Sequence, residues 1–180
     1  MPPAFNQKER IMKTLVLFSS ANKQGNTAKL IAEIARIHPL EIIDIDNLYI
    51  TPYNYENTYP VDDFYPLVDK ILAADKLVFA SPVYWHATTA PMKALIDRIT
   101  ELTDVPHLKP KARALANKQT YVVSTSASEE LCDVFDGFFA RVFNYFNMNY
   151  ISKLHVNCRE SFKLDELALN TFSQALSKGC

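Results

Sequence analysis

The stretch LVLFSSANKQGNT, residues 15–27, passes from an apolar run through small polar residues into the start of a helical pattern. Its apolar part does not alternate with polar residues, which is typical of a parallel strand covered by helices on both faces. Two further runs have the same character, KLVFA at 76–80 and TYVVS at 120–124. These three runs predict the central strands of a parallel β-sheet.

Two other runs mix polar with apolar residues and therefore predict edge strands, LEIIDID at 40–46 and YISKLHV at 150–156. Helical patterns separate the five runs, so strand and helix alternate along the chain. Right-handed crossovers then favour a doubly wound α/β fold, a five-stranded parallel sheet of order 2-1-3-4-5 with helices on both faces. The expected strands are 13–19, 40–45, 76–81, 119–124 and 149–156. Chain direction reverses between strands one and three, and ligands bind in the crevice at that point.

The helices are predicted from apolar spacing of three and four residues. One apolar face comprises Met92, Leu95, Ile96, Ile99 and Leu102, and the opposite, polar face comprises Lys93, Asp97, Arg98 and Glu101. Another face comprises Leu131, Val134, Phe135, Phe138, Val142 and Phe146, preceded by Ser126 and Glu129 as a candidate capping box. Leu30, Ile31, Ile34 and Ala35 mark the first helix, and weaker patterns cover 61–74 and 162–177.

Composition narrows the range of functions. A chain of 180 residues suits one domain, expected at 13–180 after an N-terminal extension at 1–12. The formal net charge is -1 and there is no block of like charge, so the sequence argues against nucleic-acid binding. No apolar run approaches the length of a membrane span, and the three widely spaced cysteines fit reduced thiols better than disulfides or a metal site. We therefore expect a cytoplasmic protein without a metal.

The loop after the first strand is a candidate anion site. Hydroxyl and amide groups are supplied by Ser19, Ser20, Asn22, Asn26 and Thr27. The first turn of the following helix adds free backbone N–H groups with partial positive charge. Gly25, one of only three glycines, would allow close backbone approach or a positive φ. The alternative is an ordinary turn capped by Asn26 or Thr27. Neither a nucleoside-triphosphate loop nor a dinucleotide fingerprint is present, so a monophosphate fits best. Lys23 either adds charge or is merely solvated.

Two more loops leave strands beside the same crevice. SPVYWHATTAPMKALIDR at 81–98 carries adjacent aromatics, Tyr84 and Trp85, on a loop stiffened by prolines. These rings either border a flat aromatic ligand or plug the end of the sheet. STSAS at 124–128 offers further hydroxyls, with helix capping as its alternative role.

The long irregular segment DNLYITPYNYENTYPVDD, residues 46–63, is rich in tyrosine and asparagine. It is either a flap over a site or a dimer contact, or else a surface loop whose tyrosines cover the sheet edge.

The motifs SSANKQGNT and SPVYWHATTAPMKALIDR together resemble the NADPH-dependent FMN reductase family of flavodoxin-like proteins, in particular the branch related to iron-sulfur flavoproteins. The resemblance implies that Ser20, Asn22, Asn26 and Thr27 hold the phosphate of FMN. It implies a ring lined by Pro82, Val83, Tyr84 and Trp85, with Ser124, Thr125 and Ser126 at its polar edge. The chain departs from the family pattern at Asn22, where Arg is frequent, and at His86, where Gly is frequent. Tyrosines replace the clustered cysteines of the iron-sulfur relatives, so no such cluster is expected.

The resemblance further implies an NAD(P)H-dependent oxidoreductase in which FMN carries hydride to a quinone, azo compound, nitroaromatic or free flavin. No side chain need act as an acid or nucleophile, and His86 is a weak candidate proton donor. Relatives commonly form homodimers. Two alternatives remain open: an electron carrier like flavodoxin, which the near-neutral charge disfavours, and a flavin-free interaction module on the same fold.

Overall fold

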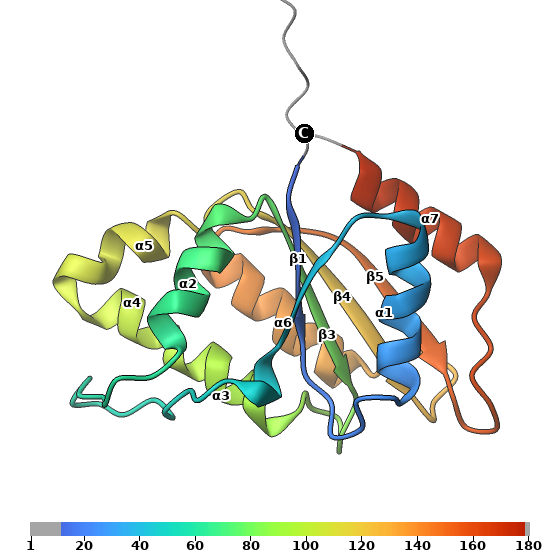
Figure 1. Ribbon diagram of the computed structural model, residues 1–180, viewed down its shortest axis with the longest axis horizontal. Coiled ribbons are helices and arrows are strands. Elements are labelled where there is room, and N and C mark those ends of the chain that lie inside the picture. Colours follow the sequence, from blue (N-terminus) through green and yellow to red (C-terminus); the bar gives the residue numbers. More distant parts are fainter. Residues whose placement is uncertain (1–11, 179–180) are drawn as a thin grey trace, which may run out of the picture.

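The computed structural model describes residues 12–178. Five parallel strands form one sheet in the order β2-β1-β3-β4-β5, which confirms the predicted topology (Figure 1). The strands are β1 (Thr14–Phe18), β2 (Glu41–Asp44), β3 (Lys76–Pro82), β4 (Gln119–Ser126) and β5 (Asn149–Asn157). Each lies within two residues of its predicted bounds at either end. The expected extension at 1–12 falls almost wholly outside the described residues, as does Cys180.

Helices cover both faces of the sheet (Figure 1). Their bounds are α1 (Asn26–Ile37), α2 (Phe64–Ala73), α3 (Ala90–Arg98), α4 (Thr100–Asp104), α5 (Lys109–Arg113), α6 (Asp133–Tyr145) and α7 (Glu166–Ser177). Two 3-10 turns, η1 (Ile45–Asn47) and η2 (Pro106–Leu108), follow β2 and α4 respectively. None of the helices in the described part of the chain is both long and apolar enough to cross a membrane.

The core is divided by the sheet because successive side chains of a strand point to opposite faces. Val16 and Phe18 of β1 pack with α1 and α7, whereas Leu15 and Leu17 pack with α2, α3 and α6. The three inner strands are almost entirely buried, as their uninterrupted apolar runs predicted. The edge strands β2 and β5 are partly exposed. The fold therefore follows from the difference between inner and edge strands.

The helix predicted at 92–102 has the expected apolar face, but its polar face differs from the prediction. Arg98 and Glu101 are 0% and 3% exposed, and they pair at 2.9 Å instead of facing water. The guanidinium of Arg98 also lies 3.3 Å from the ring centroid of Tyr59 and 3.5 Å from an oxygen of Asp62. Here a tertiary partner overrides the helical pattern, because the segment before α2 closes over this face.

The segment 46–63 is fastened to α3 and α4 by those contacts. Tyr53 donates a hydrogen bond to Asp104 at 2.7 Å, and Tyr65, just beyond the segment, donates one to Glu101 at 2.6 Å. The pKa of each phenol is raised to about 12, chiefly by the hydrogen bond for Tyr53 and chiefly by burial for Tyr65. Tyr53 and Tyr59 of the segment thus contact α4 and α3, as a surface loop would, whereas Tyr49 and Tyr55 are 61% and 89% exposed.

The prediction for α6 needs two corrections. The fully buried residues are Phe135, Phe139 and Phe143, whereas Val134 is 68% exposed. The helix begins after Cys132, which occupies the N-cap position without a side-chain cap. The predicted capping box of Ser126 and Glu129 therefore does not exist, because both residues lie well before the first turn.

Candidate functional site

The carboxyl ends of β1, β3 and β4 lie side by side, as the register shows. Phe18 is paired with Ala80, and Pro82 with Thr125. The ladder continues into the loops, since Ser19 N donates to Ala80 O and Val83 N donates to Thr125 O, both at 3.0 Å. The three predicted site loops, far apart in sequence, thus begin at one edge of the sheet.

Helix α1 begins without a side-chain cap. Its N-cap residue is Gly25, so neither Asn26 nor Thr27 caps the helix, and that alternative is wrong. Among the described residues, the backbone N–H groups of Asn26 and Thr27 donate no hydrogen bond. Free N–H groups at a helix start carry partial positive charge and bind anions. This end of α1 is therefore chemically suited to a phosphate.

Gly25 is required by close packing, because its φ is −76° and any residue could adopt that angle. A Cβ at this position would lie 3.1 Å from the Cβ, Cγ and carbonyl oxygen of Asn22. The tight approach is stabilised by a hydrogen bond of 3.1 Å from Gly25 N to Asn22 O. Gly25 thereby lets the loop turn closely in front of α1.

A hollow of about 310 Å³ lies where these loops meet. It is lined by Ser20, Asn22, Gln24, Gly25, Asn26, Thr27, Lys29, Pro82, Tyr84 and Thr125. The hydroxyls of Thr27 and Thr125 are 2.7 Å apart and join the first loop directly to the end of β4. Hydroxyl, amide and backbone N–H groups thus share one space with an aromatic ring.

The interior side of the first loop is held by a residue that sequence reasoning missed, Asp46. Its carboxylate accepts from Ser19 Oγ at 2.5 Å and from Ser20 N at 3.1 Å. Ser19 is 0% exposed and also contacts Thr89 Oγ1, so it supports the loop from behind. The signal lay in the sequence, since Asp46 follows the second strand at the same edge of the sheet.

Two lysines near the hollow, Lys23 and Lys29, differ in whether they are paired with carboxylates. Lys23 forms ion pairs with Asp44 and Asp46, although 39% of its side chain remains exposed, and it does not line the hollow. Burial opposes its charge, but the hydrogen bonds to the two carboxylates prevail and raise the pKa of Lys23. Lys29, which the sequence did not single out, lines the hollow and has no ion pair within residues 12–178. The cation available to an anion in the hollow is therefore Lys29.

The second loop is a tight hairpin turn. Tyr84 N donates to Ala87 O at 2.9 Å, and Ala87 N donates back to Tyr84 O at 3.0 Å. Trp85 and His86 between them have φ values of 48° and 64°, the left-handed pair of a type I′ turn. Glycine adopts a positive φ without steric cost, whereas a residue with a Cβ does not. His86, which stands where the family frequently has Gly, therefore strains the backbone.

The turn displays its aromatic side chains unequally. Trp85 is 96% exposed at the tip, whereas Tyr84 is 43% exposed and lines the hollow. Val83 packs against the core, and His86 Nδ1 lies 3.2 Å from Cys132 Sγ. Because Trp85 stands out in solvent, it does not plug the end of the sheet.

The third loop contributes one member to the hollow, Thr125. Ser124 Oγ is buried and, among the described residues, has no hydrogen-bond partner. Ser126 Oγ lies 2.8 Å from His155 Nε2 and accepts from Ser128 N, so it serves the loop's own structure. Burial lowers the pKa of His155.

The structure thus brings together most of the predicted site residues. Those lining the hollow are Ser20, Asn22, Gly25, Asn26, Thr27, Pro82, Tyr84 and Thr125. Those beside or behind it are Ser19, Val83, Trp85, Ser124 and Ser126.

Comparison with known proteins adds a sequence relationship. A family model described as NADPH-dependent FMN reductase matches residues 12–162. The protein YwqN of Bacillus subtilis (strain 168), named as a candidate NAD(P)H-dependent FMN-containing oxidoreductase, is 27% identical over 124 residues. That match covers 63% of this chain and 66% of YwqN, just under two thirds of the relative's length.

Solved structures agree in fold. The Trp repressor binding protein from Bacillus subtilis superposes with a TM-score of 0.72 at 20% identity, covering 93% of this chain and 99% of that one. A protein from P. pentosaceus described as an NADPH-quinone reductase gives a TM-score of 0.66 at 17% identity, covering 93% of this chain and 100% of that one. Because the family model spans far more than half of the chain, the protein belongs to the NADPH-dependent FMN reductase family.

Proposed function

We propose that the protein is an FMN-dependent NAD(P)H oxidoreductase that delivers hydride from a reduced nicotinamide to a small acceptor. Family membership supports the reaction class. The observation that carries the proposal is the hollow in which the uncapped start of α1 meets Thr125 and Tyr84. Such a space suits a phosphorylated ligand with a flat ring.

The residues present fit FMN. The N–H groups of Asn26 and Thr27, with the side chains of Ser20 and Asn22, would hold the phosphate, and Lys29 would offset its charge. Charge-assisted hydrogen bonds contribute roughly 1.5–3 kcal/mol each, so several neutral donors replace the frequent family Arg that is absent at Asn22.

The ring would lie beside Pro82, Val83, Tyr84 and Trp85, with Ser124, Thr125 and Ser126 at the end of β4 forming its polar edge. Ser124 Oγ, at the end of β4, is a buried polar group without a hydrogen-bond partner among residues 12–178, so it is a candidate contact for the ligand. Bound FMN would supply the hydride chemistry, and the protein's part is to orient the ring and limit access of water. The exposed imidazole of His86, beside Cys132, remains a candidate proton donor to the acceptor.

The proposed acceptors are quinones, azo compounds, nitroaromatics and free flavin. A quinone is the first to test, because a structural neighbour is described as an NADPH-quinone reductase. We further propose a cytoplasmic homodimer. A groove of about 350 Å³ on α3 and α6, lined in part by Ile96, Phe138 and the 68%-exposed Tyr145, offers apolar surface for it. Light scattering of the purified protein tests the dimer.

The function is tested by the visible spectrum of the purified protein, followed by oxidation of NADH or NADPH with a quinone. Bound yellow flavin with turnover is the expected result. Flavin without turnover would instead support an electron carrier. A colourless protein that does not take up added FMN would contradict the proposal.

A further inference from the structure

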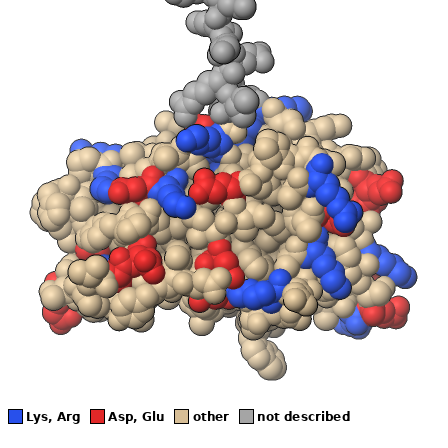
Figure 2. All heavy atoms as spheres, in the orientation of Figure 1, with Lys and Arg blue, Asp and Glu red and all other residues tan. Residues whose placement is uncertain are grey.

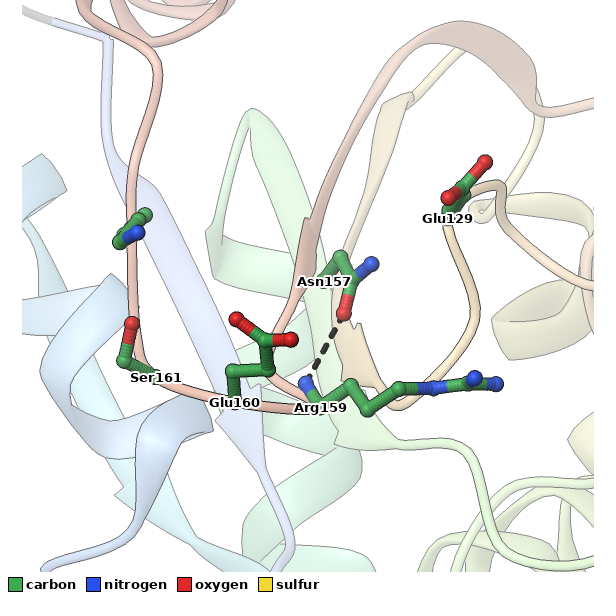
Figure 3. Close-up of a pocket in the computed structure, with 6 residues that line it drawn as sticks. Glu129, Asn157, Arg159, Glu160 and Ser161 are labelled. Carbon is green, nitrogen blue, oxygen red and sulfur yellow. Dashed lines mark hydrogen bonds between the residues drawn. The ribbon is translucent and has the colours of Figure 1, made fainter.

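A second cavity, of about 540 Å³, opens between the loop after β4 and the loop after β5. It is lined by Glu129, Asn157, Arg159, Glu160, Ser161 and Lys163, none of which lines the first hollow (Figure 3). Its volume is within the range of small-molecule sites. It therefore has room for a ligand portion separate from the one in the first hollow.

The two cavities are neighbours at the same edge of the sheet. Asn157 is paired with Ser126, one residue beyond Thr125 of the first hollow. Cys158 N donates to Ser126 O at 2.7 Å, and Arg159 Nε donates to Ala127 O at 3.0 Å. Adjacent strands are about 4.8 Å apart. A ligand lying over the first hollow can thus extend across the β4 loop into the second.

The basic side chains of the cavity are available to an anion. The bond from Nε to Ala127 holds the guanidinium of Arg159 in place while leaving its two terminal amino groups without a partner among residues 12–178. Lys163 also has no ion pair in that range. Asn157 Oδ1 accepts from Arg159 N at 2.9 Å, the dashed line in Figure 3, so its amide NH₂ remains a donor.

Two carboxylates make the lining selective. Glu129, on the loop after β4, and Glu160, on the loop after β5, line the same cavity as Arg159 and Lys163, so two carboxylates accompany the two cations. Lys, Arg, Asp and Glu are also interspersed across the visible face of the molecule in Figure 2. A free phosphate would be opposed by the carboxylates, whereas a ligand with phosphates and sugar hydroxyls satisfies both kinds of group.

We propose that this cavity binds the adenosine phosphate half of the reduced nicotinamide dinucleotide while its nicotinamide lies over the first hollow. The proposal rests on the proposed function, which requires such a substrate. Arg159 and Lys163 contact phosphate, and Glu129 and Glu160 accept hydrogen bonds from ribose or adenine.

The first experiment compares NADPH with reduced nicotinamide mononucleotide, which lacks the adenosine half. Arg159→Gln and Lys163→Gln should each raise KM for NADPH roughly tenfold, as the loss of one charge-assisted contact predicts. They should leave KM for the mononucleotide and the affinity for FMN unchanged. The control is Arg36→Gln, an exposed charge loss at the far end of α1. Equal effects on both donors, or no effect on NADPH, would overturn the proposal.

The second experiment is independent of turnover. Adenosine 2′,5′-bisphosphate and ADP, which match the adenosine phosphate halves of NADPH and NADH, are each titrated calorimetrically into the full chain, wild type and variants, without any hydride donor. We expect the wild type and Arg36→Gln to bind, and we expect Arg159→Gln to lose most of its affinity. No binding by the wild type, or inorganic phosphate binding equally tightly, would refute the nucleotide site. Failure of the proposed function would be distinguishable from failure of the nucleotide site, because the protein would then not take up FMN or would not turn over the mononucleotide.

Discussion

The contact between Thr27 and Thr125 is the direct physical link between the first site loop and β4. The two residues are 2% and 5% exposed, and their hydroxyls are 2.7 Å apart. Replacing either residue by Val keeps the shape of the side chain and removes one hydroxyl, which leaves the other buried without a partner. Such a loss costs about 1–3 kcal/mol of unfolding free energy. Replacing both removes the unpaired group as well.

The double-mutant cycle therefore has a defined expectation. The losses of unfolding free energy in Thr27→Val and Thr125→Val, added together, should exceed the loss in the double variant by about 1 kcal/mol. This difference is the coupling expected for a buried hydrogen bond. Urea unfolding of the FMN-free protein, followed by circular dichroism, measures all four members. Thr171→Val, which removes an exposed hydroxyl bonded to Leu167 O, is the matched control and should be additive with Thr125→Val. Additivity of Thr27→Val and Thr125→Val within about 0.3–0.5 kcal/mol would show that the two hydroxyls are not coupled and would contradict this link between α1 and β4.

Further predictions concern binding, the buried ion pair, pH and the aromatic turn. Asn22→Ala removes a side-chain donor from the proposed phosphate site and should weaken FMN binding by roughly tenfold, measured by quenching of flavin fluorescence; unchanged affinity would remove the Asn22 side chain from the phosphate site. Arg98→Met strands the carboxylate of Glu101 and should cost about 3–5 kcal/mol in urea unfolding, whereas a cost below about 1 kcal/mol would mean that the pair is solvated. Burial lowers the pKa of His155, so the unfolded state binds more protons and stability falls as pH drops below about 6.5. His155→Gln should flatten that loss as the pH is lowered from neutral through the histidine range, and an unaltered pH profile would contradict it. Tyr84→Ala should change the bound-flavin spectrum or turnover more than the melting temperature, and the reverse would favour the plug interpretation.

The sheet could be predicted because its inner and outer strands differ in composition. The unbroken apolar runs around Val16, Val78 and Val122 require cover on both faces, and that requirement places them at the centre. The strand order then follows from handed crossovers. The same logic located the site, since the loops after three neighbouring strands must begin at one edge of the sheet.

What the sequence did not reveal depends on tertiary contacts. Arg98 and Glu101 look like a solvated helix face, and only the return of Asp62 and Tyr59 over them explains their burial. Likewise, Lys23 looks free until β2 brings Asp44 and Asp46 beside it.

Two local backbone conformations also could not be predicted from the sequence. The type I′ turn at Trp85 and His86 contains neither Asn nor Gly, the residues from which such turns are usually predicted. The exposure of Trp85 therefore could not be predicted from the sequence. The alternative of a side-chain cap at Asn26 or Thr27 is wrong because the N-cap position is occupied by Gly25, which has no side chain.

The most direct test is an amide NMR titration of the ¹⁵N-labelled protein with FMN and, separately, with riboflavin, which lacks the phosphate. We predict that FMN shifts the backbone amides of Asn26 and Thr27 strongly, while riboflavin shifts mainly those of Tyr84 and Thr125. Equal shifts of Asn26 and Thr27 by both ligands, or strongest FMN shifts around Arg159 and Lys163 in the second cavity, would contradict the phosphate site at α1.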